Sequence, residues 1–192
     1  MQLTIETRRL QLRPFCASDA RRIAFLAGDY EVAKMCGRVP HPYSLQTAID
    51  WVATHEAQRA SRAEFAFAVV LERDGLIGSC GVTHLKDAPE RVWEIGYWLG
   101  APYWGLGYAT EAAEALMAWA RDQLGATSFC AGHFADNPAS GHVLRKLGFA
   151  HTHSEMLFGL ARQTRARGER YVWPEGLADA RLLGLHGAHP PH

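Results

Sequence analysis

The N-terminal third of the chain opens with alternating apolar and polar residues, a pattern typical of a half-buried strand. Residues 3–13 are therefore predicted to form a first strand. Two stretches with helical spacing follow. A serine-aspartate pair can cap the first of them over residues 20–27, and Ser44 can cap the second over residues 45–59. We expect Ile49, Val52 and Trp51 on the buried side of the second helix.

Three strands are predicted in the middle of the chain. Residues 65–71 and 76–84 form a predicted hairpin, because an Arg-Asp-Gly turn separates two apolar stretches. Residues 86–90 are polar and contain a proline, which predicts a loop, and residues 92–99 form the third strand.

The spacing of apolar residues then changes to that of a helix. An apolar stripe runs along residues 110–124, and Gly125 ends this predicted helix. Residues 127–133 form a predicted strand. Asn137 followed by proline is a strong helix start, and the helix that it opens is predicted to stop at Gly148.

Two last strands are predicted over residues 149–160 and 169–173. The order of elements predicts the α/β (α+β) class, with a mixed central sheet of about six to seven strands flanked by helices. Residues 92–133 form a βαβ unit whose two strands are expected to be parallel. One domain is expected over residues 1–176, followed by a partly disordered tail at 177–192.

Composition excludes several classes of protein. The 192 residues include 20 Lys and Arg and 20 Asp and Glu, and a mainly electrostatic nucleic-acid binder would be basic. No apolar run reaches membrane-spanning length, and the start lacks the pattern of a secretory signal. The four cysteines form no Cys-x-x-Cys pair, so we expect no metal, reduced thiols and a cytoplasmic location.

A glycine-containing segment between a predicted strand and a predicted helix carries the strongest chemical signal. It reads Trp104-Gly-Leu-Gly-Tyr-Ala109. Glycine lets the backbone approach a ligand closely, and a helix start offers unpaired N–H groups and the positive end of the helix dipole. We therefore expect a seat for a phosphate or pyrophosphate, the alternative being glycines that serve only a tight turn. The segment matches neither a Walker loop nor a dinucleotide fingerprint.

Two further features lie at the same predicted edge of the sheet. Asn137-Pro-Ala-Ser140 opens the helix after the next strand, and ligands of parallel sheets sit outside the carboxyl ends of the strands. By alternation, Glu94, Gly96 and Trp98 share one face of their strand. Glu94 is therefore a candidate general base, the alternative being a solvated strand residue.

Together these segments resemble the GNAT superfamily of acetyltransferases. The resemblance covers about residues 3–160 and is closest to the branch typified by ribosomal-protein N-terminal serine and alanine acetyltransferases. It implies a GNAT-like fold, N-acetyltransferase activity and acetyl-CoA as the acyl donor. It rests on Thr7-Arg-Arg-Leu-Gln-Leu-Arg-Pro14, Glu94-Ile-Gly-Tyr-Trp-Leu, Tyr103-Trp-Gly-Leu-Gly-Tyr-Ala-Thr-Glu-Ala112, Asn137-Pro-Ala-Ser140 and Leu144-Arg-Lys-Leu-Gly-Phe149.

The resemblance also implies where acetyl-CoA binds. The diphosphate would lie on amides at the helix start, and the pantetheine arm would run along the strand end like an added strand. Trp104 and Leu106 stand where the superfamily often has Gln or Arg and a further basic residue, so phosphate binding is expected to depend on backbone N–H groups. The expected cofactor contacts are Trp98, Leu99, Gly100, Trp104, Gly105, Leu106, Gly107, Tyr108, Ala109, Thr110, Asn137 and Ser140.

The implied reaction is direct attack of an amine on the thioester in a ternary complex. Glu94 would act as base through water, with His133 as an alternative, and backbone N–H groups at the strand end would polarise the carbonyl. By resemblance Ser140 would lie near the thioester sulfur and protonate the departing thiolate, with Tyr103 or Tyr108 as alternatives.

The acceptor is expected to be a protein N-terminal α-amine. Its pKa of about 7.7–8.0, against about 10.4 for lysine, leaves more of it neutral and able to attack. The alternatives are a small-molecule amine (polyamine, aminoglycoside or amino acid), a non-catalytic acyl-CoA-binding module, or a nucleotide-binding regulator. We expect a monomer or homodimer with no nucleic-acid or membrane partner. Segments 29–56 and 86–91 are expected to shape the acceptor cleft, with Tyr30, His41, Tyr43 and Glu56 among their residues.

Overall fold

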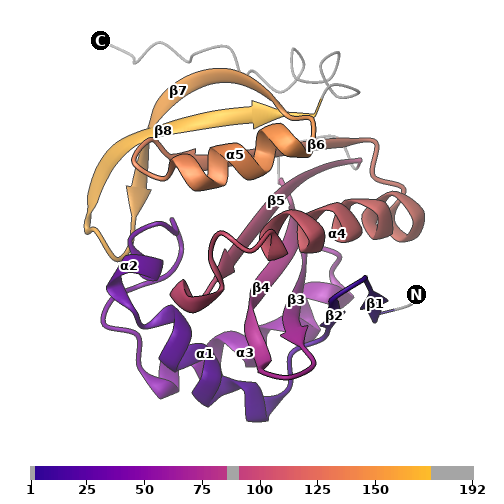
Figure 1. The fold of residues 1–192 in the computed structure, drawn as a ribbon, viewed down its shortest axis with the longest axis vertical. Helices are drawn as coiled ribbons and strands as arrows, with labels where there is room; N and C mark the ends of the chain where they lie inside the picture. Colours follow the sequence, from indigo (N-terminus) through magenta and orange to yellow (C-terminus); the bar gives the residue numbers. More distant parts are fainter. Residues whose placement is uncertain (1–2, 86–90, 174–192) are drawn as a thin grey trace.

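The alternating segments of the sequence pair into one eight-stranded sheet, in the order β1-β2-β3-β4-β5-β6-β8-β7 (Figure 1). The computed structural model describes residues 3–85 and 91–173. The predicted loop at 86–90, the predicted tail at 177–192 and the predicted domain end at 176 therefore lie outside the described residues. The strands are β1 (Ile5–Glu6), β2 (Leu10–Arg13), β3 (Glu64–Leu71), β4 (Gly75–His84), β5 (Val92–Leu99), β6 (Ser128–Phe134), β7 (Ala150–Gly159) and β8 (Thr164–Val172).

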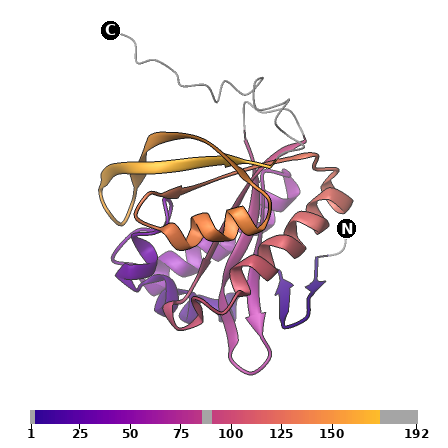
Figure 2. The same cartoon turned by 45° about the horizontal axis from the view of Figure 1, so that its top comes forward.

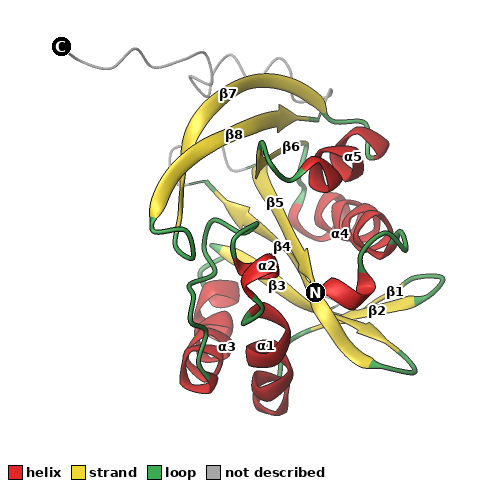
Figure 3. Cartoon of the chain, turned by 60° about the vertical axis from the view of Figure 1, so that its left-hand side comes forward, coloured by secondary structure: helices red, strands yellow, loops and turns green. Residues whose placement is uncertain are grey.

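Helices cover both faces of the sheet, which confirms the predicted mixed α/β class. Figure 3 shows α1, α2 and α3 on one face and α4 and α5 on the other. No helix in the described part of the chain is both long and apolar enough to cross a membrane. The helices are α1 (Ala20–Ala27), α2 (Tyr30–Ala33), α3 (Leu45–Ala60), α4 (Tyr108–Leu124) and α5 (Pro138–Lys146).

The N-terminal segment differs from its prediction, because residues 3–13 form a two-stranded hairpin instead of one strand. Thr7 closes the turn: its backbone N–H donates to the Leu10 carbonyl at 2.9 Å, and its hydroxyl oxygen accepts from the Leu10 amide at 2.9 Å. A polar side chain that replaces strand partners in this way is typical of a turn. The hairpin lies beside α4, as Figure 2 shows.

The second predicted helix is present as α3, and its cap is confirmed. The Ser44 hydroxyl accepts from the Thr47 amide at 3.0 Å. Its buried side is confirmed in part: Trp51 and Val52 pack against the core, whereas Ile49 is 44% exposed. Ala48 and His55 are buried, and the His55 ring packs against Phe15 and Trp51.

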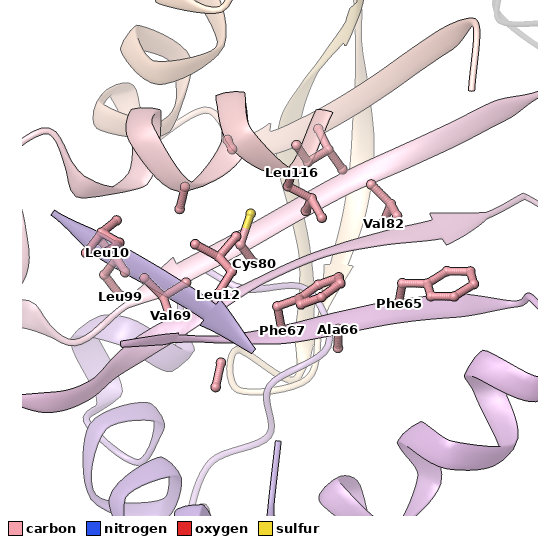
Figure 4. Packing of buried hydrophobic residues seen from close by; sticks show 14 of the residues in the cluster. Leu10, Leu12, Phe65, Ala66, Phe67, Val69, Cys80, Val82, Leu99 and Leu116 are labelled. Carbon is pink, nitrogen blue, oxygen red and sulfur yellow. The ribbon is translucent and has the colours of Figure 1, made fainter. Parts of the chain in front are cut away.

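The hydrophobic core on the other face is centred on α4. Its predicted apolar stripe is confirmed, with Leu116 completely buried against the sheet (Figure 4). The Trp119 ring packs edge-on against Phe65 and Phe67, which lie on the central strand β3. This packing fixes α4 on the sheet and thereby fixes the place where the helix begins.

The pairing of β5 with β6 decides where a ligand can enter. The two strands are parallel, as predicted, but they pair only from Val92, opposite Ser128, to Glu94, opposite Cys130. Beyond Glu94, β5 continues to Leu99 and β6 to Phe134 without pairing to each other. The sheet is therefore open between the second halves of these two strands.

Candidate active site

A cavity of about 1010 Å³ opens where β5 and β6 separate. It is lined by Glu94 and by Tyr97, whose side chains point to opposite faces of the sheet by strand alternation. Residues of the glycine segment, the start of α5, and β8 also line it. The cavity therefore reaches both faces of the sheet, and two molecules can approach one another through the gap.

The glycine segment starts α4 without a side-chain cap. Gly105 and Gly107 have φ of 74° and 82°, a left-handed conformation that favours glycine. The first intrahelical bond of α4 runs from the Glu111 amide to the Gly107 carbonyl at 3.1 Å. The amides of the first three residues of α4 therefore have no acceptor within the helix. This geometry fits the predicted phosphate seat, and α4 begins two residues earlier than predicted, at Tyr108.

The start of α5 is built differently, because Asn137 caps it. The Asn137 side-chain oxygen accepts from the Ser140 amide at 3.2 Å. Both residues line the cavity. Because the oxygen is used by the helix, the NH₂ group of Asn137 is the part that suits a bound pantetheine arm.

The strand end predicted to pair with the pantetheine arm is partly occupied by bonds within the protein. The indole N–H of Trp104 donates to the Leu99 carbonyl at 2.7 Å, and the Gly100 amide donates to the Ile77 carbonyl at 2.9 Å. Trp104 thus ties the glycine segment back to β5. The edge of β5 without a strand beside it lies between Ile95 and Leu99.

Glu94 is held by an arginine from β8 that the sequence did not reveal. Its carboxylate accepts from Arg170 Nη1 at 2.9 Å, and Arg170 also pairs with Glu155 at 3.2 Å. Arg170 stands opposite Gly132 of β6, and a Cβ at Gly132 would lie 2.6 Å from Arg170 Nη1. Glycine at this position therefore lets the guanidinium cross β6 and reach Glu94.

Arg170 remains charged in this partly buried place. Burial lowers the pKa of its guanidinium, but the negative charge of Glu94 and the other nearby acidic groups outweighs burial and raises the pKa above its usual value. The Arg170 side chain is 17% exposed, against 32% for Glu94. The carboxylate therefore faces the cavity with a fixed cation beside it.

Ser140 is joined to a tyrosine that was not among the predicted site residues. The Tyr97 hydroxyl lies 3.0 Å from Ser140 Oγ and also donates to the Ser140 carbonyl at 3.2 Å. Burial raises the pKa of the Tyr97 phenol, and this outweighs the opposite effect of the Ser140 hydrogen bond. The phenol is therefore neutral at pH 7 and can donate a hydrogen bond. Strand alternation places Tyr97 on the face opposite Glu94, and this was the one signal in the sequence from which Tyr97 could have been predicted as a site residue.

The alternative catalytic residues are engaged elsewhere. His133 is buried, and its ring nitrogens lie 2.7 Å from the Phe134 carbonyl and 3.4 Å from the Tyr171 hydroxyl. The Tyr103 hydroxyl accepts from Arg22 at 2.8 Å. Both His133 and Tyr103 also line the cavity.

The residues named for the acceptor cleft do not line the main cavity. The expected segment does contribute, but through Met35, Arg38 and Trp51. His41 and Tyr43 line a smaller, separate cavity of about 530 Å³. Within the described residues no group of three His, Cys, Asp or Glu side chains could hold a metal ion, and all four cysteines are free thiols.

Comparison with known proteins gives a family and a set of relatives. A family profile described as an acetyltransferase (GNAT) domain matches residues 9–150. YoaA of Bacillus subtilis (strain 168), described as an uncharacterized N-acetyltransferase, is 31% identical over 147 residues, which cover 76% of this chain and 81% of that protein.

Solved structures share the fold at low sequence identity. Mycobacterium smegmatis RimJ in complex with CoA-disulfide has a TM-score of 0.79 at 18% identity and covers 95% of this chain and 94% of that one. A ribosomal-protein-alanine acetyltransferase of Vibrio fischeri has a TM-score of 0.76 at 19% identity, with 89% and 96% covered.

Replacing Gly132 tests whether Arg170 positions Glu94. In Gly132→Ala the new methyl group displaces the Arg170 guanidinium, so we expect turnover to fall about tenfold, as in Arg170→Ala. The double variant should fall no further, because both changes remove the same contact. Steady-state turnover of the three variants measures this, with thermal unfolding to confirm the fold. Wild-type turnover in Gly132→Ala, or additive losses, would contradict the arrangement.

Proposed function

Because the chain belongs to the GNAT acetyltransferases, we propose that it transfers the acetyl group of acetyl-CoA to the α-amine of a protein N-terminus. The profile match confirms the family resemblance, and the chain is an acetyl-CoA-dependent N-acetyltransferase. The acceptor class is the proposed part. The observation that carries it is the charge pattern of the cavity, in which each carboxylate of the described lining is paired with an arginine.

The donor side of the gap is the face that carries α4 and α5. Acetyl-CoA supplies an activated acyl group as a thioester when it is bound. The uncapped first turn of α4 is suited to the diphosphate, because its free amides and helix dipole favour an anion. The NH₂ group of Asn137 and the open edge of β5 are suited to the amide groups of the pantetheine arm.

The acceptor side is the face that carries Glu94. An attacking amine must be neutral, and Glu94 can take its proton, directly or through water. Arg170 holds the Glu94 carboxylate in place through a contact of 2.9 Å. An α-amine, which gives up its proton near neutral pH, needs less help from a base than a lysine side chain does.

The charge pattern disfavours polycationic acceptors. Glu64 pairs with Arg38 at 3.2 Å, and Asp136 pairs with Arg162 at 2.9 Å. Together with Glu94 these are the carboxylates among the described residues of the lining. Their charges are therefore already compensated, whereas a polyamine or aminoglycoside needs several free carboxylates.

The departing thiolate can be protonated on the donor face. Ser140 and Tyr97 share a hydrogen bond at 3.0 Å, so a proton can pass along their hydroxyls to the thiolate while a proton from solvent replaces it. The raised pKa of Tyr97 keeps the phenol protonated, so the pair relays a proton and holds no lasting negative charge. This pair places an acid on the side of the gap opposite the base.

Thiol release across an amine panel tests the acceptor class. The panel comprises peptides with a free N-terminal Ser or Ala, the same peptides with a blocked N-terminus, spermidine, kanamycin and free amino acids. We expect the free-N-terminus peptides to release CoA fastest and the blocked peptides to release none. A faster reaction with spermidine, kanamycin or amino acids would contradict the proposal. Binding of acetyl-CoA without thiol release from any amine would instead indicate a non-catalytic module.

Replacing Glu94 tests the base. Glu94→Gln should lower kcat about a hundredfold with the KM for acetyl-CoA unchanged, because the amide cannot accept the proton. Glu155→Gln is the matched control, since Glu155 also pairs with Arg170 but its side chain is 43% exposed. We expect it to retain turnover within about twofold. Equal losses of kcat in both variants would show that pairing with Arg170, and not proton acceptance by Glu94, is what turnover requires, and would contradict the proposed base.

Replacing Ser140 and Tyr97 tests the acid. Ser140→Ala should lower kcat about tenfold, and Tyr97→Phe should lower it less, since Ser140 alone still reaches the thiolate. The KM for acetyl-CoA should stay within about twofold in both. Steady-state kinetics with saturating acceptor measures the split. A raised KM with unchanged kcat would assign these residues to binding alone.

A further inference from the structure

We propose that Arg9 is a positioning residue for the binding of the cofactor's diphosphate. Arg9 fixes the glycine segment and cancels the charge of Glu111 at the start of α4. This inference rests on the proposed function, because it requires the diphosphate to bind at that helix start. Arg9 lies in the turn of the β1–β2 hairpin, far from the glycine segment in sequence. The hairpin itself lies beside α4 (Figure 2).

Arg9 contacts both the glycine segment and the first turn of α4. Its Nη1 donates to the Leu106 carbonyl at 3.0 Å, and its Nε donates to Glu111 Oε2 at 2.7 Å. The guanidinium also stacks on the Tyr108 ring, 4.4 Å from its centre. A guanidinium has a planar fork of donors, so it can hold a carbonyl and a carboxylate at once.

The contact between Arg9 and Glu111 matters because Glu111 carries a negative charge at the proposed phosphate site. It lies in the first turn of α4, where a carboxylate stabilises the helix but repels a bound anion. Burial raises the pKa of the Glu111 carboxyl, but hydrogen bonds from Thr7 and Arg9 outweigh burial and lower it below its usual value. Glu111 is therefore ionised at neutral pH, and its charge must be cancelled before a diphosphate binds next to it.

The hairpin turn is built around this carboxylate. The Thr7 hydroxyl donates to Glu111 Oε1 at 2.7 Å, and the Arg9 amide donates to the same oxygen at 2.8 Å. With the Arg9 side chain on Oε2, both oxygens are occupied. Charge-assisted bonds of this kind are the stronger class, so the carboxylate is held away from the cofactor seat.

Arg9 also lies against Gly107, the glycine at the start of α4. A Cβ at Gly107 would be 3.4 Å from Arg9 Nη2. Trp104 and Leu106 stand where the family resemblance implies Gln or Arg and a further basic residue, so the side chains of the segment add no positive charge. Arg9 of the N-terminal hairpin places a guanidinium beside the segment, where it balances the charge of Glu111.

Steady-state kinetics with two acyl donors tests this role. Acetyl-CoA carries the diphosphate, and acetyl-pantetheine lacks it. We expect Arg9→Ala to raise the KM for acetyl-CoA about tenfold with kcat within about twofold, and to leave the kinetics with acetyl-pantetheine unchanged. Arg9→Ala/Glu111→Gln should return the KM for acetyl-CoA to within about threefold of wild type, because the repelling charge is gone.

Controls separate this role from a structural one. Arg8→Ala removes an exposed neighbouring cation and should match wild type with both donors. Arg9→Met, which keeps the stem over Tyr108, replaces Arg9→Ala if that variant unfolds. An unchanged KM for acetyl-CoA, an equal loss with both donors, or no recovery with Glu111→Gln would overturn the role of Arg9. A wild-type enzyme that uses both donors equally well would instead overturn the diphosphate seat itself.

Discussion

Backbone pairing between β5 and β6 ends after Glu94, and the rest of the site depends on this ending. A parallel ladder that continued to Leu99 would fill the space in which a ligand can lie. Because the ladder stops, side chains hold the gap open instead. Tyr97 reaches Ser140 on one face, and Arg170 reaches Glu94 on the other. The gap is thus a defined opening through the sheet, with the proposed acid on one side and the proposed base on the other.

Charge compensation is the second constraint on this opening. The carboxylates of the described lining are each held by an arginine, and the carboxylate at the helix start is held by Arg9. The carboxylates of the lining are therefore already paired before a ligand binds. This is the basis for proposing an α-amine, and not a polycation, as the acceptor.

Local sequence signals predicted most of the fold. The caps Ser44 and Asn137 and the apolar stripe of α4 depend on neighbours within a few residues, and the structure contains them as predicted. The N-terminal hairpin was missed because the Thr7 side chain, not a glycine or proline, closes its turn. The four-residue helix α2, capped by Asp29, was also missed, since so short a helix has little periodicity.

Only the sequence motifs of the candidate site could be predicted. The ion pairs that hold the site could not be predicted, because they join residues far apart in the sequence: Arg9 and Glu111 are separated by 102 positions, and Glu94 and Arg170 by 76. No spacing rule relates such residues, whose contact depends on sheet order. The insertion of β8 between β6 and β7 is what brings Arg170 over Gly132. Glu94 was likewise predicted as a candidate base, whereas the cation that pairs with it, Arg170, was not predicted.

The measurement closest to the central claim is a crystal structure of the protein with CoA. The account predicts the diphosphate at the first turn of α4, within hydrogen-bonding distance of the amides of Tyr108 and Ala109. It also predicts the thiol in the gap between β5 and β6, beside Ser140. A diphosphate bound elsewhere, or a thiol that does not enter the gap, would contradict the account.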